Sequence, residues 1–376
     1  MTEIYLIRHA QAEGNRFRII QGHWDGYVTA QGRREIALLE ARLRTIPFAA
    51  VYASDLYRAR LTAAAVARPQ GLAVQTDRAL RELNAGSWEG AFFGNIQHEQ
   101  PELARAFVFD AESWRLPDAE TFAELGERMA AALERIAARH EGQRVAVVSH
   151  GAAIRAGLSR LLSLDMKDRE RLPMCGNTAV NILCCENGRW RAEVLNDTGH
   201  LGPLELPAWG STAALRHETL DPRADRVFYN ACYRDAWYAA HGNLDGYFAD
   251  FYLSAAAEHH RACPGAVMKL LDGDEPAGLV DLDTRRGSHA GYGWLSLLYL
   301  KPEYRGKGYG IQALARAITF YRALGRTSLR LVAAEDNARA LAFYRREGFR
   351  QIGTEPGSGA DLLLLEMPLR ERRDDV

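Results

Sequence analysis

The sequence lacks a surplus of charge of either sign. Its 376 residues include 47 lysines and arginines against 48 aspartates and glutamates, which gives a formal net charge of −1. Binding to a nucleic-acid backbone needs a surplus or a cluster of cations, so we expect no nucleic-acid partner. No apolar run approaches the roughly 18–20 residues of a membrane helix, so we expect no membrane partner either. A strand-like pattern begins by Ile4, which leaves no room for a signal peptide.

Cysteine is scarce, and its spacing indicates no pairing. The cysteines are odd in number and contain no CxxC motif, so we expect free thiols in a reducing cytoplasm. No cluster of histidine, cysteine and carboxylate residues has the spacing of a metal site, so we expect no metal cofactor. Nothing in the sequence indicates an oligomeric state. The five cysteines are Cys175, Cys184, Cys185, Cys232 and Cys263.

Strand and helix patterns alternate along the first half of the chain. At about 150 residues per domain, the length corresponds to two or three domains. The alternation is typical of βαβ units and predicts a mostly parallel sheet covered by helices. One strand, RVAVVSH, is a continuous apolar run that suits burial on both faces of the sheet. We expect strands at residues 4–9, 50–54 and 144–150, and helices at 32–46, 55–69, 121–142 and 152–164.

The pattern changes in the second half. Residues 179–195 are typical of two strands joined by an Asn-Gly turn. Residues 202–210 lie in a segment with two prolines and no helical period, and we interpret them as a linker. The predicted domains are therefore residues 1–201 and 211–376. In the second domain we expect helices at 225–241, 246–261, 310–325 and 338–348, a hairpin at 266–283, and strands at 292–300, 328–334 and 361–369.

Two apolar strands of the first domain end in a histidine followed by a small residue. His9 belongs to the segment LIRHA, and His150 belongs to VVSHG. Ligands bind at the carboxyl ends of strands in an open parallel sheet, so both histidines face one crevice if their strands are neighbours. Arg8 precedes His9, and Arg58 lies in the first turn of a helix that we expect Ser54 to cap. Two arginines and two histidines at a helix N-terminus indicate a phosphate site.

Glu82 lies in the glycine-rich segment RELNAGSWEG, where it is placed to supply a proton. This segment, together with LIRHA, SDLYRARLTA and VVSHG, resembles the histidine phosphatase superfamily, also called phosphoglycerate-mutase-like. The resemblance spans about residues 1–201 and includes Asn15, GHWDGYVTAQG and the closing LNDTGHL. It implies a mostly parallel, three-layer α/β/α domain in which Asn15 helps to hold the phosphate.

The resemblance also implies a catalytic role for each of the other residues. His9 is the nucleophile, which attacks phosphorus as a neutral imidazole and forms a phosphohistidine. Arg8, Arg58 and His150 bind the non-bridging oxygens and stabilise the transferring group. Glu82 protonates the leaving alkoxide and then deprotonates the attacking water, which needs a carboxyl pKa raised toward neutrality.

Phosphatase and mutase are alternatives within this family. Mutases of the family carry a longer domain and a glutamate-centred segment that holds phosphoglycerate, whereas that place in this sequence reads RELNAGSWEG. We therefore expect hydrolysis of a small phosphorylated metabolite, with phosphoglycerate mutase activity as the alternative.

A second glycine-rich segment, YRGKGYGIQ, joins a strand pattern to a helix pattern. Glycines let the backbone approach a ligand, and the following helix offers free N–H groups to an anion. The spacing is GxGxG, so the segment is neither a Walker loop, GxxxxGK followed by Ser or Thr, nor a Rossmann loop, GxGxxG. A loop that is rich in glycine only because it turns is the alternative.

This loop and the segment EDNARALAFYRREGFR resemble the GNAT acetyltransferase superfamily over about residues 211–369. The loop matches an R/QxxGxG/A signature, and the second segment places an Asn and a Tyr seven residues apart before Gly-Phe. The resemblance implies a mixed-sheet α+β domain. The matching residues are Arg305, Gly308, Gly310, Asn337, Tyr344, Gly348 and Phe349.

The GNAT resemblance implies acetyl-CoA as co-substrate and an amine, on a small molecule or a protein, as acceptor. The amine attacks the thioester carbonyl directly, Tyr344 protonates the departing thiolate, and Asn337 touches the cofactor. Strand backbone pairs with the pantetheine arm, and the glycine loop holds the pyrophosphate. The implied cofactor-binding residues are Leu298, Tyr299 and Leu300 on the strand, and Arg305, Gly306, Lys307, Gly308, Tyr309, Gly310 and Ile311 in the loop.

The general base of the acetyl transfer has no obvious candidate. The positions at which many relatives carry a glutamate are Trp294 and Val332, and neither can accept a proton. Asp281 and Asp283 are substitutes, although strand alternation favours a solvated face for them. A water chain is equally consistent with the sequence.

His259 and His260 are adjacent on a predicted helix and point in different directions, so we expect them to lie on the surface. The sequence as a whole predicts a cytoplasmic bifunctional enzyme, with a histidine phosphatase domain followed by a GNAT N-acetyltransferase domain. Two alternatives are an acyl-CoA-sensing GNAT domain that regulates the phosphatase and a non-catalytic interaction protein.

Overall fold

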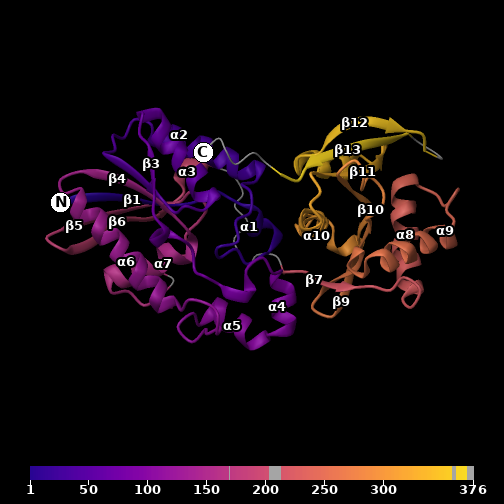
Figure 1. Ribbon diagram of the computed structural model, residues 1–376, viewed down its shortest axis with the longest axis horizontal. Helices are drawn as coiled ribbons and strands as arrows, with labels where there is room; N and C mark the ends of the chain where they lie inside the picture. The colour runs from indigo at the N-terminus through magenta and orange to yellow at the C-terminus, as the bar shows by residue number, and fades with distance from the viewer. Residues whose placement is uncertain (169, 203–212, 358–360, 371–376) are drawn as a thin grey trace. The chain divides into compact units, whose positions relative to one another are not determined.

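The structure, a computed structural model, describes residues 1–168, 170–202, 213–357 and 361–370. The chain divides into two compact units, with the division between residues 211 and 212 (Figure 1). The predicted linker over residues 202–210 lies outside the described residues except for Gly202.

The first unit contains a six-stranded sheet of order β3-β2-β4-β1-β5-β6. The first four strands of that order run parallel to one another, and β5 and β6 are antiparallel additions at one edge. The strands are β1 (Thr2–Arg8), β2 (Ala50–Ala53), β3 (Val74–Thr76), β4 (Arg144–Ser149), β5 (Val180–Glu186) and β6 (Arg189–Asp197). The helices are α1 (Glu13–Phe17), α2 (Ala30–Leu43), α3 (Tyr57–Ala67), α4 (Phe93–Glu99), α5 (Pro101–Phe109), α6 (Phe122–Arg139) and α7 (Gly151–Leu162).

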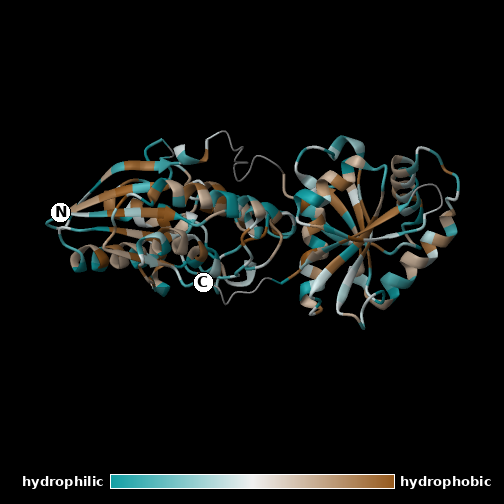
Figure 2. Ribbon diagram, turned by 90° about the horizontal axis from the view of Figure 1, so that it is seen from above, coloured by the Kyte–Doolittle hydropathy of each residue, from teal (hydrophilic) through white to brown (hydrophobic). Residues whose placement is uncertain are grey.

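Helices cover both faces of this sheet, which confirms the predicted three-layer α/β/α architecture. Leu39 of α2 and Val66 of α3 pack in one core cluster with alternate residues of β1, β2 and β4. Helices α6 and α7 lie on the opposite face (Figure 1). The capping box that begins α6 pairs Thr121 with Glu124, each backbone N–H donating to the other's side chain. Hydrophobic residues accordingly follow the central strands in Figure 2.

The parallel pairing of β1 with β4 determines where the two strand ends that carry histidines lie. The register places Arg8 opposite Ser149, so His9 and His150 follow neighbouring strands at the same edge of the sheet. The expected Asn-Gly hairpin between β5 and β6 is also present, since Asn187 and Gly188 both have positive φ angles, of 50° and 74°.

The second unit contains a mixed seven-stranded sheet of order β12-β13-β11-β10-β9-β8-β7, which confirms the expected α+β architecture. The strands are β7 (Arg216–Thr219), β8 (Val267–Asp272), β9 (Glu275–Asp283), β10 (Tyr292–Leu300), β11 (Ser328–Ala334), β12 (Arg350–Glu355) and β13 (Leu362–Pro368). The helices are α8 (Arg226–His241), α9 (Ala249–Ala262), α10 (Tyr309–Ala323) and α11 (Ala338–Arg346).

Strands β10 and β11 pair in parallel, and their pairing is short. Their pairing joins Tyr292, Gly293 and Trp294 to residues 328–330 and extends no further among the described residues. Helices α8 and α9 pack on one face of the sheet, where Tyr229 and Tyr299 belong to one core cluster. Helix α10 lies on the other face (Figure 1).

All five cysteines are free thiols in the structure. Over the described part of the chain, no helix combines the length and the apolar character needed to cross a membrane.

Candidate functional site

His9 lies just after β1 and is buried, with its orientation fixed on two sides. Its Nδ1 is 2.7 Å from the carbonyl oxygen of Ala10, and Asn177 Nδ2 donates to the His9 carbonyl at 3.0 Å. A carbonyl can only accept, so Nδ1 carries the proton and Nε2 keeps its lone pair. Burial, and then the charges of Arg58 and Arg8, hold the pKa of His9 well below its usual value. His9 is therefore a neutral imidazole at neutral pH, as a nucleophile must be.

His150 is the N-cap residue of α7, and its ring centroid is 5.0 Å from that of His9. Both of its ring nitrogens are buried and have no hydrogen-bond partner among the described residues. Burial lowers the pKa of His150 most, and the charge of Arg58 lowers it further. Buried polar atoms normally have partners, so two unpartnered nitrogens on one ring indicate that a ligand supplies them.

Arg8 reaches the same place from the end of β1. Its Nη1 donates to the carbonyl oxygen of Cys175 at 2.5 Å. Its guanidinium lies against Gly151, where a Cβ atom would be 3.2 Å from Arg8 Nε. That Nε is buried without a partner in the described structure. The absence of a side chain at the first position of α7 therefore gives Arg8 its place beside His150.

Arg58 is completely buried in the first turn of α3, as expected. Its terminal nitrogens donate to the carbonyl oxygens of Gly22 at 2.8 Å and Trp24 at 3.1 Å, while its Nε has no described partner. Asp25 lies 3.3 Å from the guanidinium and also accepts the Tyr57 N–H at 2.7 Å. The guanidinium is thus held rigidly, with Nε as its one nitrogen that has no described partner.

The expectation that Ser54 caps α3 is wrong. The N-cap residue is Leu56, whose side chain makes no cap hydrogen bond. In the described structure, Ser54 Oγ accepts the Leu56 N–H at 3.4 Å, and the Asp25 carboxylate accepts the first N–H of the helix instead. The cap therefore comes from a distant loop, and the same carboxylate also holds Arg58.

The side chain of Glu82 reaches the N-terminus of α7, which His150 caps. Its carboxylate accepts the N–H groups of Ala152 at 3.1 Å and Ala153 at 2.9 Å. Its charge also acts on the pKa of Arg58, which burial lowers first and Asp25 and Glu82 raise. A carboxylate is thus present at the helix N-terminus that follows His150 and near Arg58.

The structure brings together five of the six predicted residues of this site: Arg8, His9, Arg58, Glu82 and His150. Four buried nitrogen atoms, on Arg8, Arg58 and His150, have no protein partner in the described residues, and three of them are donors when His150 is neutral. Cationic and neutral donors around a neutral imidazole form a site for a tetrahedral oxyanion. The described contacts do not join Asn15 to this group, because its Oδ1 accepts the Ala12 N–H at 2.9 Å within α1.

Three further residues position the site and were not predicted. Asp25 holds Arg58, Asn177 holds the His9 carbonyl, and Thr62 accepts the Ala10 N–H at 3.0 Å. Asp25 lies in the segment GHWDGYVTAQG, which is part of the resemblance to the histidine phosphatases. Nothing in the sequence indicated that it contacts Arg58. Asn177 is 168 residues from His9, and no local pattern could have paired them.

In the second unit, the glycine loop leads from β10 into α10. Gly306 and Gly308 have φ angles of 78° and 84°, which favour glycine, and Gly308 is the N-cap residue of α10. Arg305 Nε donates to the Leu300 carbonyl at 2.7 Å and ties the loop to the strand. The first N–H groups of a helix have no partner within it, so this loop presents donors to an anion.

The edge of β10 beside this loop is open. After Trp294 the strand pairs only with β9 in the described structure, although β11 continues alongside β13. Leu298, Tyr299 and Leu300 lie on this part of β10. The Tyr299 hydroxyl donates to Asp235 at 3.1 Å, so its side chain is held toward α8 and its backbone remains at the open edge. An extended chain can add to such an edge as a strand does.

Tyr344 and Asn337, the other two predicted residues, lie on α11. Asn337 is the N-cap residue, and its Oδ1 accepts the Ala340 N–H at 3.1 Å, so a cofactor contact would fall to its amide nitrogen. Tyr344 is buried against Phe349, with ring centroids 5.3 Å apart, and burial raises the pKa of its phenol. The hydroxyl therefore keeps its proton at neutral pH.

The expectations for Asp281 and His259 are wrong. Asp281 is 2% exposed rather than solvated, and it accepts from Tyr229 at 3.0 Å. His259 Nδ1 lies 2.7 Å from Asp281 Oδ1, with its side chain 13% exposed. The two adjacent histidines do point in different directions, because no contact of His260 with either aspartate is found among the described residues. The sequence did not show that one of the two faces the sheet.

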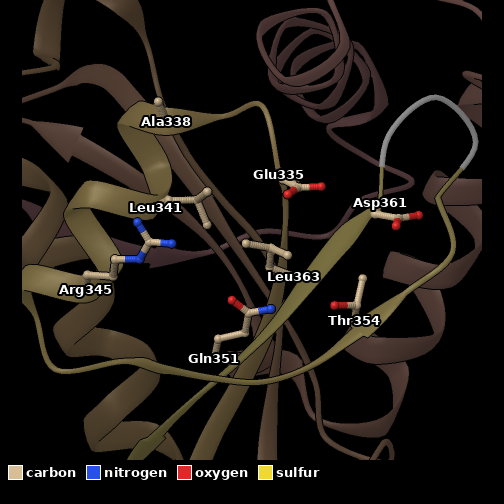
Figure 3. A pocket seen from close by; sticks show the side chains of 8 residues that line it. All are labelled: Glu335, Ala338, Leu341, Arg345, Gln351, Thr354, Asp361 and Leu363. Carbon is tan, nitrogen blue, oxygen red and sulfur yellow. The ribbon is translucent and has the colours of Figure 1, made fainter.

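A separate pocket of about 480 Å³ lies between α11 and strands β12 and β13 (Figure 3). Leu341 and Leu363 line it together with exposed polar side chains such as Arg345 and Glu335. It contains none of the predicted site residues, and we assign it no role. Among the described residues, no group of three or more His, Cys, Asp and Glu side chains is arranged to hold a metal ion.

Comparisons with known proteins give a finding for each unit. The family model "Histidine phosphatase superfamily (branch 1)" matches residues 4–198, and the model "Acetyltransferase (GNAT) family" matches residues 226–349. The "Probable phosphoglycerate mutase GpmB" of Yersinia enterocolitica is 34% identical over 210 residues, which cover 55% of this chain and 97% of that protein. The protein of the same name in Yersinia pestis is 33% identical with the same coverage.

Among solved structures, Bacillus stearothermophilus YhfR is similar to the first unit. The TM-score is 0.52 with 28% sequence identity, and the match covers 54% of this chain and 100% of that one.

Proposed function

Since the chain belongs to the histidine phosphatase superfamily through residues 4–198 and carries a GNAT acetyltransferase domain over residues 226–349, we propose that it is a bifunctional enzyme. The first unit hydrolyses a phosphate monoester, and the second transfers an acetyl group from acetyl-CoA to an amine. The observation that carries the first activity is the set of unpartnered buried nitrogens on Arg8, Arg58 and His150 near the neutral His9.

The hydrolysis proceeds in two steps at His9. Nε2 attacks phosphorus, the bond from phosphorus to the ester oxygen breaks, and Glu82 gives its proton to the departing alkoxide. Arg8, Arg58 and His150 bind the three non-bridging oxygens. Water, which loses a proton to Glu82, then attacks the phosphohistidine, releases inorganic phosphate and restores the free imidazole.

Phosphoglycerate mutase activity is the second candidate for the first unit, because the relatives from both Yersinia species are named for it. Both activities pass through the phosphohistidine and differ in what accepts its phosphoryl group. In the phosphatase the acceptor is water, and in the mutase it is a second hydroxyl of phosphoglycerate. Incubation with 3-phosphoglycerate separates them. We expect inorganic phosphate to be released, and formation of 2-phosphoglycerate without phosphate release would establish the mutase instead.

For the second unit, the residues fit acetyl-CoA at three places. The open edge of β10 at Leu298, Tyr299 and Leu300 suits the pantetheine arm, and the loop from Arg305 to Ile311 with the α10 N-terminus suits the pyrophosphate. Tyr344 lies buried with its proton retained, as an acid for the thiolate must be. Acetyl-CoA supplies the activated acyl group, and the amine attacks it without a covalent enzyme intermediate.

Isothermal titration with acetyl-CoA, followed by an assay for free CoA in the presence of primary amines, tests the second activity. Binding together with amine-dependent CoA release supports the transferase. Binding without release for any amine would support the alternative of an acyl-CoA sensor. The implied partners are a small phosphorylated metabolite and an amine. The five free thiols are consistent with our proposal of a cytoplasmic location.

A further inference from the structure

A cluster of titratable side chains crosses three elements of the second unit. His259 of α9 lies between two aspartates of β9, with Nδ1 2.7 Å from Asp281 Oδ1 and Nε2 3.6 Å from Asp283 Oδ2. Tyr229 of α8 donates to the other oxygen of Asp281 at 3.0 Å. Asp281 is almost fully buried, so its two partners satisfy a carboxylate that has no access to water.

The cluster lies next to the point where β10 stops pairing with β11. In the antiparallel register of β9 and β10, Asp283 is directly opposite Trp294. Directly opposed residues share a face of the sheet, with Cβ atoms about 5 Å apart. Trp294 is also the last residue of β10 that pairs with β11. Asp283 therefore lies beside the point from which an extended cofactor arm would continue along β10.

The groups around the cluster leave Asp283 as its outward member. Two of its neighbours, Arg285 and Arg286, donate only backbone N–H groups to Asp283 Oδ1, at 2.9 and 3.0 Å. The Arg286 guanidinium lies over the Trp294 ring and pairs with Glu355.

The Arg285 guanidinium instead reaches Glu258, the residue that precedes His259 on α9, at 4.0 Å. Glu258 also pairs with Arg261 at 3.4 Å. From α8, Tyr229 faces Asp281. The other oxygen, Asp283 Oδ2, lies 3.6 Å from His259 Nε2, and the Asp283 side chain is 24% exposed, so an incoming amine can reach it.

We propose that Asp283 takes the proton of the attacking amine and that His259, oriented by Asp281, is the positioning residue that receives it from Asp283. This inference rests on the proposed acetyl transfer. The bond from the amine nitrogen to the acetyl carbon forms, and the bond from that carbon to sulfur breaks. The nitrogen's extra proton moves to Asp283 Oδ2 and on to His259 Nε2, while Tyr344 gives its proton to the thiolate. His259 then releases the proton to water, and Tyr344 regains one.

The charges of the cluster support this direction of transfer. Burial alone would lower the pKa of His259, but the hydrogen bonds and charges of Asp281 and Asp283 outweigh it and raise the pKa to about 9. His259 in turn holds the pKa of Asp283 well below its usual value. A proton that arrives at Asp283 therefore moves on to the imidazole whenever His259 is neutral, so transfer speeds up as the pH rises toward 9.

The test uses the full-length chain with acetyl-CoA and a panel of primary amines, with free CoA measured between pH 6 and 10. We expect Asp283→Asn to lower kcat on the order of 10²-fold with little change in the KM for acetyl-CoA. We expect His259→Gln to lower kcat less, on the order of 10-fold, and to remove the rise in rate that ends near pH 9. The matched control Glu258→Gln changes an exposed neighbour on the same helix and should leave both unchanged.

The outcomes separate the inference from the function on which it rests. If both variants keep the wild-type kcat and pH profile, the inference is wrong, and a loss of thermal stability alone would leave the cluster a structural tie between α9 and β9. Asp283→Asn leaves the contact between His259 and Asp281 in place, so it serves as the test if His259→Gln fails to fold. If the wild type binds acetyl-CoA but turns over no amine, the proposed transferase itself is contradicted.

Discussion

The two units bury histidines among charges of opposite sign. In the first unit, His9 and His150 lie beside Arg8 and Arg58, and burial with these cations holds the histidine pKa values well below normal. In the second, His259 lies between two aspartates, which outweigh its burial and raise its pKa to about 9. Histidine is therefore neutral in the first unit, where it can attack phosphorus or donate a hydrogen bond to an oxyanion. In the second unit it is a protonated cation at neutral pH. Burial lowers the pKa of all three histidines, and the neighbouring charges determine whether that lowering is reinforced or reversed.

The largest effect that tests this contrast is expected from His9→Ala. Loss of the nucleophile should lower the hydrolysis of p-nitrophenyl phosphate by several orders of magnitude, on the order of 10⁴–10⁶-fold. Acetyl-CoA affinity, measured by titration calorimetry, should be unchanged because His9 belongs to the other unit. His98→Ala, at an exposed histidine of α4, is the control. Retention of full phosphatase activity would refute the role of His9.

The next largest effect is expected from removal of the acid Glu82, which protonates the leaving alkoxide. Glu82→Gln should lower kcat for alkyl phosphates on the order of 10²–10⁴-fold, because their alkoxide leaving groups need an acid. Formation of the phosphoenzyme from p-nitrophenyl phosphate should be far less affected, because nitrophenolate leaves without protonation. Burst kinetics on the two substrates measure the difference. Equal losses on both would show that Glu82 acts in some way other than as an acid.

Tyr344→Phe extends the comparison to the second unit, with a smaller expected effect. Protonation of the thiolate matters mainly in the transition state, so kcat for acyl transfer should fall on the order of 10²-fold while acetyl-CoA affinity changes little. Phe343→Leu, which alters the adjacent ring on α11, is the control for packing. A parallel loss of affinity and kcat in Tyr344→Phe would contradict the acid role.

The sequence predicted the first site better than the second for a physical reason. His9, His150 and Arg58 owe their positions to local features, namely strand ends and a first helical turn, and parallel pairing brings such features together. Even there, the cap from Asp25 and the support from Asn177 come from distant loops and left no local signal.

The cluster around His259 depends entirely on tertiary packing. Its partner Asp281 is 22 residues away on another element, and alternation in β9 cannot tell a solvated face from one that a helix covers. The short strands β3, β7 and β12 were missed as well. They contain three, four and six residues, and all three are edge strands, so none of their residues is fully buried.

The smallest effect is on stability, and it has opposite signs in the two units. A depressed pKa means that the unfolded chain binds protons more readily, so His9 and His150 destabilise the first unit as pH falls below about 6.5. A raised pKa acts the other way. The stability that His259 contributes is complete below about 6.5 and is lost as pH rises through about 9.

The change from His259 should amount to about 1–2 kcal/mol once solvent screening is allowed for. Thermal unfolding of the chain between pH 5 and 10 should therefore show the second unit weakening above pH 6.5, and His259→Gln should flatten that limb. A second unit whose stability is independent of pH in this range would mean that the aspartates do not hold a proton on His259.

The most direct test of the central claim is to identify the phosphorylated residue. The Glu82→Gln variant should accumulate the intermediate from p-nitrophenyl phosphate, because water attack lacks its base. Rapid quenching at alkaline pH and peptide mass spectrometry should then find one acid-labile phosphoryl group on His9. A phosphoryl group on another residue, or continued turnover with none on the protein, would contradict the account.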